Sequence, residues 1–259
     1  MSALAPFVRA LASGDIDVID LTAPLTSETP VLQLPEPFAN TVPFTLREVS
    51  RYDDRGPAWY WNDIHTGEHT GTHFDAPVHW VTGAEGRDIA QVPATELLAP
   101  GVVLDFSAQS AADPDFLLSV DDVRGWEATH GPLPSGGWLL LRTGWDAYAH
   151  DAERYLNTDE TGSHTPGISG DCARWLAEET DILGIGVETV GTDAGMAAGF
   201  TPPFPCHALL LGAGKYGLTQ LQRLERLPAT GTLIITAPLP IVGGSGSPAR
   251  VLALVDRTA

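Results

Sequence analysis

Cysteine is scarce in this 259-residue chain, which contains only Cys172 and Cys206. Two thiols are too few for the disulfide framework of a small secreted protein, and too few for a zinc site built from cysteine. The scarcity therefore favours a reducing compartment, and we expect a cytoplasmic protein.

Long apolar runs are also missing, because no stretch approaches the eighteen uninterrupted apolar residues typical of a membrane-spanning helix. Residues 1–20 lack the basic segment and apolar core of a secretory leader. Basic side chains number 14 against 33 acidic ones, and the formal net charge of −19 repels nucleic-acid phosphates and anionic lipids. We therefore expect neither a membrane nor a nucleic acid as a partner.

No internal repeat, low-complexity tract or linker divides the chain, and its composition, 43% hydrophobic and 18% charged, is ordinary for a globular protein. We therefore predict a single domain over residues 1–259. Pro24 to Pro43 carries five prolines in twenty residues, which disfavours a helix or a central strand. We expect residues 1–45 to form an extended, irregular N-terminal arm.

Short apolar runs bounded by turn residues recur along the chain and are typical of buried strands. They are Val102 to Phe106, Trp138 to Arg142, Ile182 to Val187, Thr232 to Ala237 and Val251 to Val255. Helical patterns begin near Ser119, with Asp122 placed for a capping box, and near Ser169. This mixture predicts the α/β class. The glycine-rich segment Gly243 to Ser247 lacks the Lys-Ser/Thr of a phosphate-binding loop, so we expect a turn there.

Histidines gather in one short segment. His69, His73, Asp75 and His79 fall within eleven residues, and His65 lies four residues upstream. An even spread of the eight histidines would place fewer than one in the fifteen positions that hold four. Imidazoles and a carboxylate are ligands that divalent metals prefer, so the segment is a candidate metal site.

The spacing of His69 and His73 equals that of a zinc-binding helix, but the glutamate of His-Glu-x-x-His is absent. Gly71 and Pro77 also disfavour a helix, so we predict a strand followed by a turn. In extended chain His73 and Asp75 point to one face, and Gly71 lets the backbone bring His69 toward them. These three residues are the predicted metal ligands.

Two imidazoles and one carboxylate suit zinc, manganese or iron and leave positions open for water and a small-molecule substrate. A bound dication acidifies its water, and His79 is placed to carry the proton as a general acid and base. The alternative is that these histidines are ordinary polar side chains. Burial of three imidazoles and a carboxylate without a cation would be costly, which favours the metal site.

The segment His69 to His79 matches His-x-Gly-Thr-His-x-Asp-x-Pro-x-His, and the chain thereby resembles the metal-dependent cyclase-like hydrolases, which include bacterial kynurenine formamidase and isatin hydrolase. Further matches cover most of the chain: Leu140 to Trp145, Thr165 to Ile168, Gly184 to Thr189, His207 to Leu210, Leu227 to Gly231, Ala237 to Ile241 and Gly243 to Pro248. The resemblance implies a swivelling β/β/α fold, a homodimer or homotetramer, and hydrolysis of an amide, lactam or N-formyl bond at a metal.

The resemblance also implies His69, His73 and Asp75 as ligands and His79 as the acid and base. In the formamidase branch a later histidine and a glutamate about twelve residues beyond it hold a second metal. His207 matches that histidine, but Thr219 and Gln220 occupy the region of the glutamate. Two cations would then repel each other with little compensation, so we expect one Mn or Zn ion per chain. Gln220 is a candidate fourth ligand, which places the chain nearer isatin hydrolase.

Several side chains are candidate substrate contacts: His207, Trp80, Trp61 and His65. The tryptophans offer flat apolar surface for a cyclic substrate, although core packing explains each one equally well. Two other functions stay open. The same metal site can hydrolyse a lactone or an ester, because an activated water does not choose amide over ester. The missing glutamate also leaves open a non-catalytic protein that uses the metal to anchor a ligand.

Overall fold

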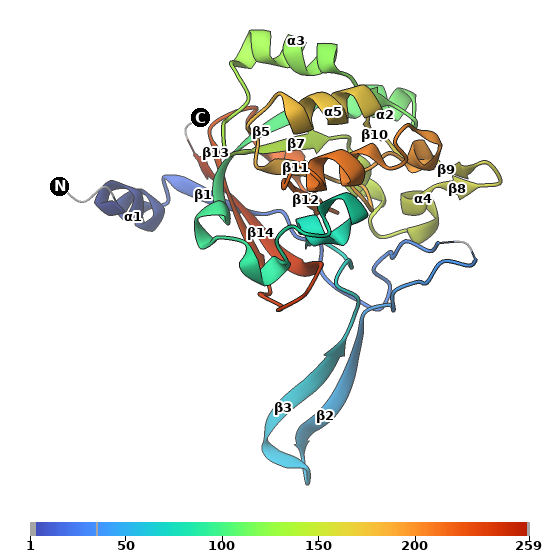
Figure 1. Ribbon diagram of the computed structural model, residues 1–259. Coiled ribbons are helices and arrows are strands. Elements are labelled where there is room, and N and C mark those ends of the chain that lie inside the picture. Colours follow the sequence, from blue (N-terminus) through green and yellow to red (C-terminus); the bar gives the residue numbers. More distant parts are fainter. Residues whose placement is uncertain (1–3, 35, 258–259) are drawn as a thin grey trace.

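Eight strands form one mixed sheet in the order β1-β14-β13-β5-β7-β11-β12-β4 (Figure 1). The computed structural model describes residues 4–34 and 36–257. The strands are β1 Ile16–Asp20, β4 His73–Asp75, β5 Leu98–Asp105, β7 Trp138–Arg142, β11 Gly184–Val187, β12 Tyr216–Thr219, β13 Thr232–Pro238 and β14 Gly246–Asp256. Because β4 pairs with both β12 and the beginning of β14, the sheet closes on itself. Each of the five predicted strands is present.

The middle of the sheet is parallel and buried on both faces, as continuous apolar runs predict. In β7 the side chains alternate between two cores: Trp138 and Leu140 belong to the core inside the closed sheet, and Leu139 and Leu141 to a second core outside it. The outer core includes Val123 of α3 (Val120–His130) and Leu176 of α5 (Gly170–Glu178). Helices therefore cover the outer face, and the α/β class is confirmed.

Both predicted helix starts are present. Ser119 and Asp122 form the predicted capping box of α3, and the Ser169 hydroxyl accepts a hydrogen bond from the Cys172 backbone N–H at the beginning of α5. Apart from 3₁₀ turns, the short elements are α2 Ser107–Ala112, β6 Leu117–Leu118, α4 Ala152–Leu156, β8 Thr158–Asp159, β9 Gly162–Ser163, β10 Gly167–Ile168 and a π-helix at Cys206–Leu211. Within the described residues, no helix has both the length and the apolar character to cross a membrane.

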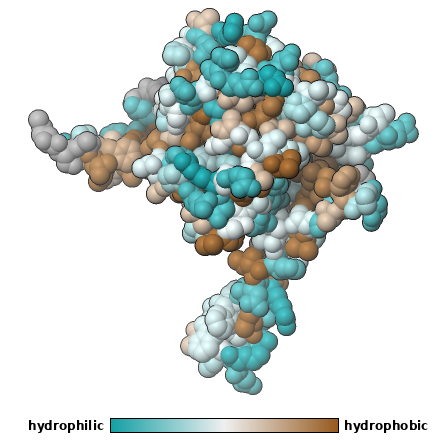
Figure 2. Space-filling view, viewed as in Figure 1, coloured by the Kyte–Doolittle hydropathy of each residue, from teal (hydrophilic) through white to brown (hydrophobic). Residues whose placement is uncertain are grey.

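The strands β2 (Thr45–Asp53) and β3 (Gly56–His65) form a hairpin that projects away from the rest of the protein (Figure 1). Within the described residues these two strands pair only with each other. Its exposed apolar side chains are Leu46, Tyr52, Trp59, Tyr60, Trp61 and Ile64. Figure 2 shows further apolar surface where the hairpin joins the rest of the protein.

The prediction of an irregular arm over residues 1–45 is wrong in its first half. Leu4–Ser13 forms the helix α1, and Ile16–Asp20 forms β1, which pairs antiparallel with the end of β14. That pairing joins residues more than 230 positions apart, so no local sequence pattern predicts it. From residue 21 to 44 the described chain has no regular element apart from a bridge between Thr22 and Leu221, as the prolines predict.

Candidate metal centre

The strand β4 carries two of the predicted metal ligands, His73 and Asp75, and separates them from the core. Phe74 is fully buried inside the closed sheet, with its ring centroid 5.9 Å from that of Trp138 and 4.9 Å from that of Tyr216. Successive side chains of a strand point to opposite faces, so His73 and Asp75 share the other face. The predicted strand and turn are confirmed, because a 3₁₀ turn at Pro77–His79 follows β4.

Two imidazole nitrogens converge on one carboxylate oxygen. Asp75 Oδ1 lies 2.8 Å from His69 Nδ1 and 3.3 Å from His73 Nε2. His73 Nδ1 donates to the backbone carbonyl of Gly71 at 2.7 Å, so in neutral His73 the nitrogen that faces Asp75 carries a lone pair. Two ligand atoms on adjacent positions of one metal ion lie about 3 Å apart, since each bond is about 2.1 Å long. The residues present therefore fit a divalent ion.

Asp75 is 1% exposed, and a buried carboxylate needs positive charge nearby. Burial by itself raises the pKa of Asp75, but His73 and His69 outweigh burial and hold the pKa well below 3.8. Asp75 therefore remains an anion at neutral pH and can attract a dication to the point where the two imidazoles meet.

His79 lies beside this cluster. Its ring stacks on that of His69 with 3.8 Å between centroids, and ligand atoms of His69, Asp75 and His79 all lie within 4.8 Å of one another. Burial is the main cause that lowers the pKa of His79 to about 3; Asp75 opposes it, and the neighbouring His69 and His207 add to it. His79 is therefore neutral at pH 7 and can accept a proton.

His207 and Trp80 complete this group of rings. The His207 centroid lies 5.4 Å from that of His79 and 4.8 Å from that of Trp80. Asp193 fixes the ring of His207, because its Oδ2 lies 2.5 Å from His207 Nδ1 and it also accepts from the backbone N–H groups of Cys206 and His207. Burial lowers the pKa of His207, but Asp193 outweighs burial and the net pKa is raised. A histidine held in this way presents Nε2 to a ligand.

Thr219 and Gln220 follow from the pairing of β12 with β4. Thr219 lies opposite His73 in the ladder, and its hydroxyl oxygen is 2.8 Å from Nδ1 and 3.1 Å from Nε2 of that ring. Gln220 is buried and has a φ of 53°. Its Nε2 donates to the Pro30 carbonyl at 3.4 Å, which leaves the amide oxygen for another partner. The role of Gln220 as a ligand stays a prediction.

Trp61 and His65 do not join the cluster within one chain. Both lie on β3 with exposed side chains, and among the described residues neither forms a hydrogen bond or ring contact with His69, His79 or His207. Both belong to the projecting hairpin, and their role as substrate contacts stays a prediction.

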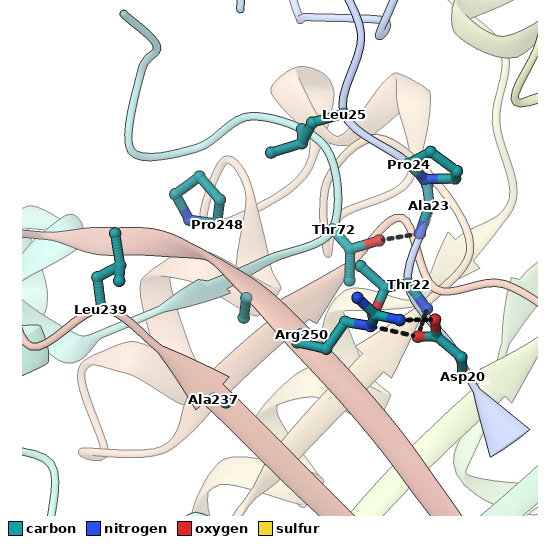
Figure 3. Close-up of a pocket in the computed structure, with 11 residues that line it drawn as sticks. Asp20, Thr22, Ala23, Pro24, Leu25, Thr72, Ala237, Leu239, Pro248 and Arg250 are labelled. Atoms are coloured by element: carbon teal, nitrogen blue, oxygen red, sulfur yellow. Dashed lines mark hydrogen bonds and ion pairs between the residues drawn. The ribbon is translucent and has the colours of Figure 1, made fainter. Parts of the chain in front are cut away.

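A cavity of about 460 Å³ lies beside Thr72, the residue before His73 (Figure 3). Its lining residues are Asp20, Thr22, Ala23, Pro24, Leu25, Thr72, Ala237, Leu239, Pro248, Ala249 and Arg250. Arg250 pairs with Asp20 at 2.6 Å, and Thr72 accepts a hydrogen bond from the Ala23 N–H at 2.9 Å. None of the clustered histidines lines this cavity. Because the reaction needs the residues of the cluster, we place it at the cluster and not in this cavity.

Comparison with known proteins shows which family this chain belongs to. Residues 19–194 match the model of a family described as "Putative cyclase". The chain belongs to the cyclase family. It is 47% identical to the isatin hydrolase of Roseibium aggregatum over 259 residues, which cover 99% of this chain and 98% of that protein.

Solved structures of the cyclase family share the fold. An isatin hydrolase bound to the product analogue thioisatinate has a TM-score of 0.96 and 46% identity, with 99% of this chain and 100% of that chain covered. A protein described as a potential metal-dependent hydrolase with cyclase activity has a TM-score of 0.66 and 25% identity, with 93% of this chain and 98% of that chain covered.

The predicted fold of the cyclase-like hydrolases is therefore confirmed. The prediction that the chain is nearer isatin hydrolase is also confirmed. The chain is an amidohydrolase of the cyclase family that acts on carbon–nitrogen bonds other than peptide bonds.

Proposed function

We propose that this chain hydrolyses the lactam of isatin, or of a closely similar cyclic amide, with one divalent metal ion. The observation that carries the proposal is the convergence of His69 and His73 on Asp75 Oδ1, in a chain that resembles isatin hydrolase over its full length. In the reaction the oxygen of water bonds to the lactam carbonyl carbon and the carbon–nitrogen bond breaks. The nitrogen gains a proton, and the new acid ionises to a carboxylate.

His69, His73 and Asp75 would hold the ion, and the amide oxygen of Gln220 is the proposed fourth ligand. When bound, the ion polarises the carbonyl and acidifies a water molecule. The predicted Mn or Zn both accept this mixed nitrogen and oxygen donor set. With Thr219 in the region of the formamidase glutamate, a second cation would meet no added anion there, which supports one ion per chain.

His79 would move the proton. Its ring stacks on that of His69 beside the proposed ion, so a ring nitrogen is placed to accept a proton from the attacking water and return it to the leaving nitrogen. The ring of Trp80, packed on His207, offers a flat surface for an aromatic lactam. The Nδ1 of His207 donates to Asp193, so His207 would donate from Nε2 to a substrate oxygen in its protonated form, which its raised pKa favours.

A substrate panel tests the proposed function. We expect kcat/KM for isatin to exceed that for a benzo-fused lactone by roughly 100-fold, because any group of the site that accepts from the lactam N–H would be left unpaired with the lactone. The loss of isatin absorbance and the release of acid measure turnover. The Asp75→Ala variant provides the background rate. Faster turnover of the lactone would favour the esterase alternative instead.

We also propose that the protein is a homo-oligomer, either a dimer or a tetramer, with a second copy covering the hairpin. Trp61 is 57% exposed and Ile64 is 68% exposed, and an isolated two-stranded hairpin is only marginally stable in water. A symmetric dimer buries the same surface of each copy.

Trp61→Arg combined with Ile64→Lys is expected to convert the oligomer into monomers at micromolar concentration, because both changes place charge where apolar side chains would meet. Light scattering after size-exclusion chromatography measures the mass. Leu4→Lys on α1, which also replaces an exposed apolar residue, is the matched control and should retain the mass of the wild type. A monomeric wild type would contradict the proposal.

A further inference from the structure

The glycine-rich segment before β14 lies against the metal centre. The backbone carbonyl of Ser245 accepts from the Ala76 N–H at 3.0 Å, directly after β4, and the Gly244 carbonyl accepts from the Ile89 N–H at 3.0 Å. A Cβ on Gly246 would lie 2.6 Å from Cε1 of His69. The lack of a side chain at Gly246 therefore lets the ring of His69 pack on this segment.

Ser245 and Glu68 form a chain of hydrogen bonds that ends at His69. The Ser245 hydroxyl lies 2.8 Å from His69 Nε2 and 2.6 Å from Glu68 Oε2. Glu68 Oε2 also accepts from the Ser245 backbone N–H at 3.0 Å. All three side chains are half-buried, so competition from water for these bonds is reduced.

The direction of each hydrogen bond follows from the number of protons. A hydroxyl has one proton, and a carboxylate can only accept. Ser245 therefore donates to Glu68 and accepts from His69, which places the proton of a neutral His69 on Nε2. Without an ion, His69 Nδ1 donates to Asp75 Oδ1 at 2.8 Å, because the carboxylate can only accept. A bound cation would take the place of that proton and leave the lone pair of Nδ1 for the ion. For His73 the order is reversed, because Nδ1 donates to the Gly71 carbonyl.

We propose that Ser245 and Glu68 are positioning residues of the metal centre, which fix the His69 ring so that it binds the ion through Nδ1 while His73 binds through Nε2. Hydrogen bonds to the second nitrogen of a ligating histidine fix its tautomer and orientation. The inference rests on the metal-dependent function proposed above, and it assigns a role to a turn 176 residues away from His69.

Metal affinity tests the proposal without reference to turnover. In Ser245→Ala, we expect the Kd for Zn²⁺, measured by competition with a chromophoric chelator, to rise roughly 10- to 100-fold. Glu68→Ala should raise it less, because Ser245 remains. Ser245→Thr, which retains the hydroxyl, should restore most of the affinity. Ser247→Ala is the matched control, since the Ser247 hydroxyl bonds to the Pro248 carbonyl and the Leu239 N–H; it should leave the Kd unchanged.

The tautomer gives a second readout. In the Zn²⁺-loaded protein with ¹⁵N-labelled histidine, long-range ¹H–¹⁵N spectra should show one ligating histidine with its proton on Nε2, which the His69→Ala variant lacks. An unchanged Kd in Ser245→Ala, or a proton on Nδ1 of His69, would overturn the inference while leaving the metal site intact. Absence of Zn²⁺ binding by the wild type would instead overturn the proposed function.

Discussion

Asp75→Ala is expected to bind no divalent ion tightly and to hydrolyse isatin about a thousandfold more slowly or worse, because the ion is the group that polarises the carbonyl and acidifies water. The expectation follows from the place of Asp75 at the centre of the site. It is 1% exposed, and its Oδ1 is the atom that His69 and His73 both approach. Without Asp75, the ring nitrogens of His69 and His73 have no anion beside them to attract the dication.

Metal analysis of the purified protein measures the first part, and we expect about one ion per wild-type chain. Asp75→Asn retains the shape of the side chain without its charge, so it covers the case in which Asp75→Ala fails to fold. His130→Ala is the matched control, because His130 is an exposed residue in the last turn of α3. A variant at Asp75 that retains the wild-type ion content would refute the ligand assignment.

His79→Ala is expected to retain the ion but to lower kcat about 10²- to 10⁴-fold, the usual contribution of a general acid and base. The stacking of His79 on His69 places it next to the ligands without the backbone hydrogen bond that orients His73. Added imidazole should restore part of the rate if the missing group is a proton carrier. His164→Ala, which removes a histidine that pairs with Asp115 instead, should change neither quantity.

His79 has two possible roles, proton carrier and metal ligand, because its ring nitrogen and the ligand atoms of His69 and Asp75 all lie within 4.8 Å of one another. The ion content of His79→Ala distinguishes these roles. Loss of the ion in His79→Ala would make it a ligand and leave the proton carrier to be found among the other rings, with His207 the first candidate. Unchanged turnover on every substrate, with ligand still bound, would favour the non-catalytic alternative.

Local patterns predicted the parts of this protein whose causes are local. Apolar runs such as Trp138 to Arg142 form strands because they are buried on both faces, and Ser119 caps α3 through a hydroxyl three residues from its partner. The alternation at β4 is of the same kind. It sends Phe74 into the core and leaves His73 and Asp75 together, so the order of residues was enough to predict this part of the metal site.

Contacts between distant segments were not predictable in this way. The predicted irregular arm was wrong over residues 16–20, because β1 forms by pairing with β14, which lies far along the chain. Trp61 and His65 were predicted near substrate from their closeness in sequence to His69, and they lie on β3 of the projecting hairpin. For β1, hydrogen bonds to a strand far along the chain decide the conformation.

By itself, then, the sequence determined the fold class, the family and the motif that brings His69, His73, Asp75 and His79 together, because strand alternation and a flexible glycine act within a few residues. Only the tertiary structure decided that Ser245 meets Glu68 and His69 and that Asp193 holds His207. Which ring nitrogen of His69 and of His207 is free depends on those partners. They come from other segments of the chain and lie beside the rings only in the folded protein.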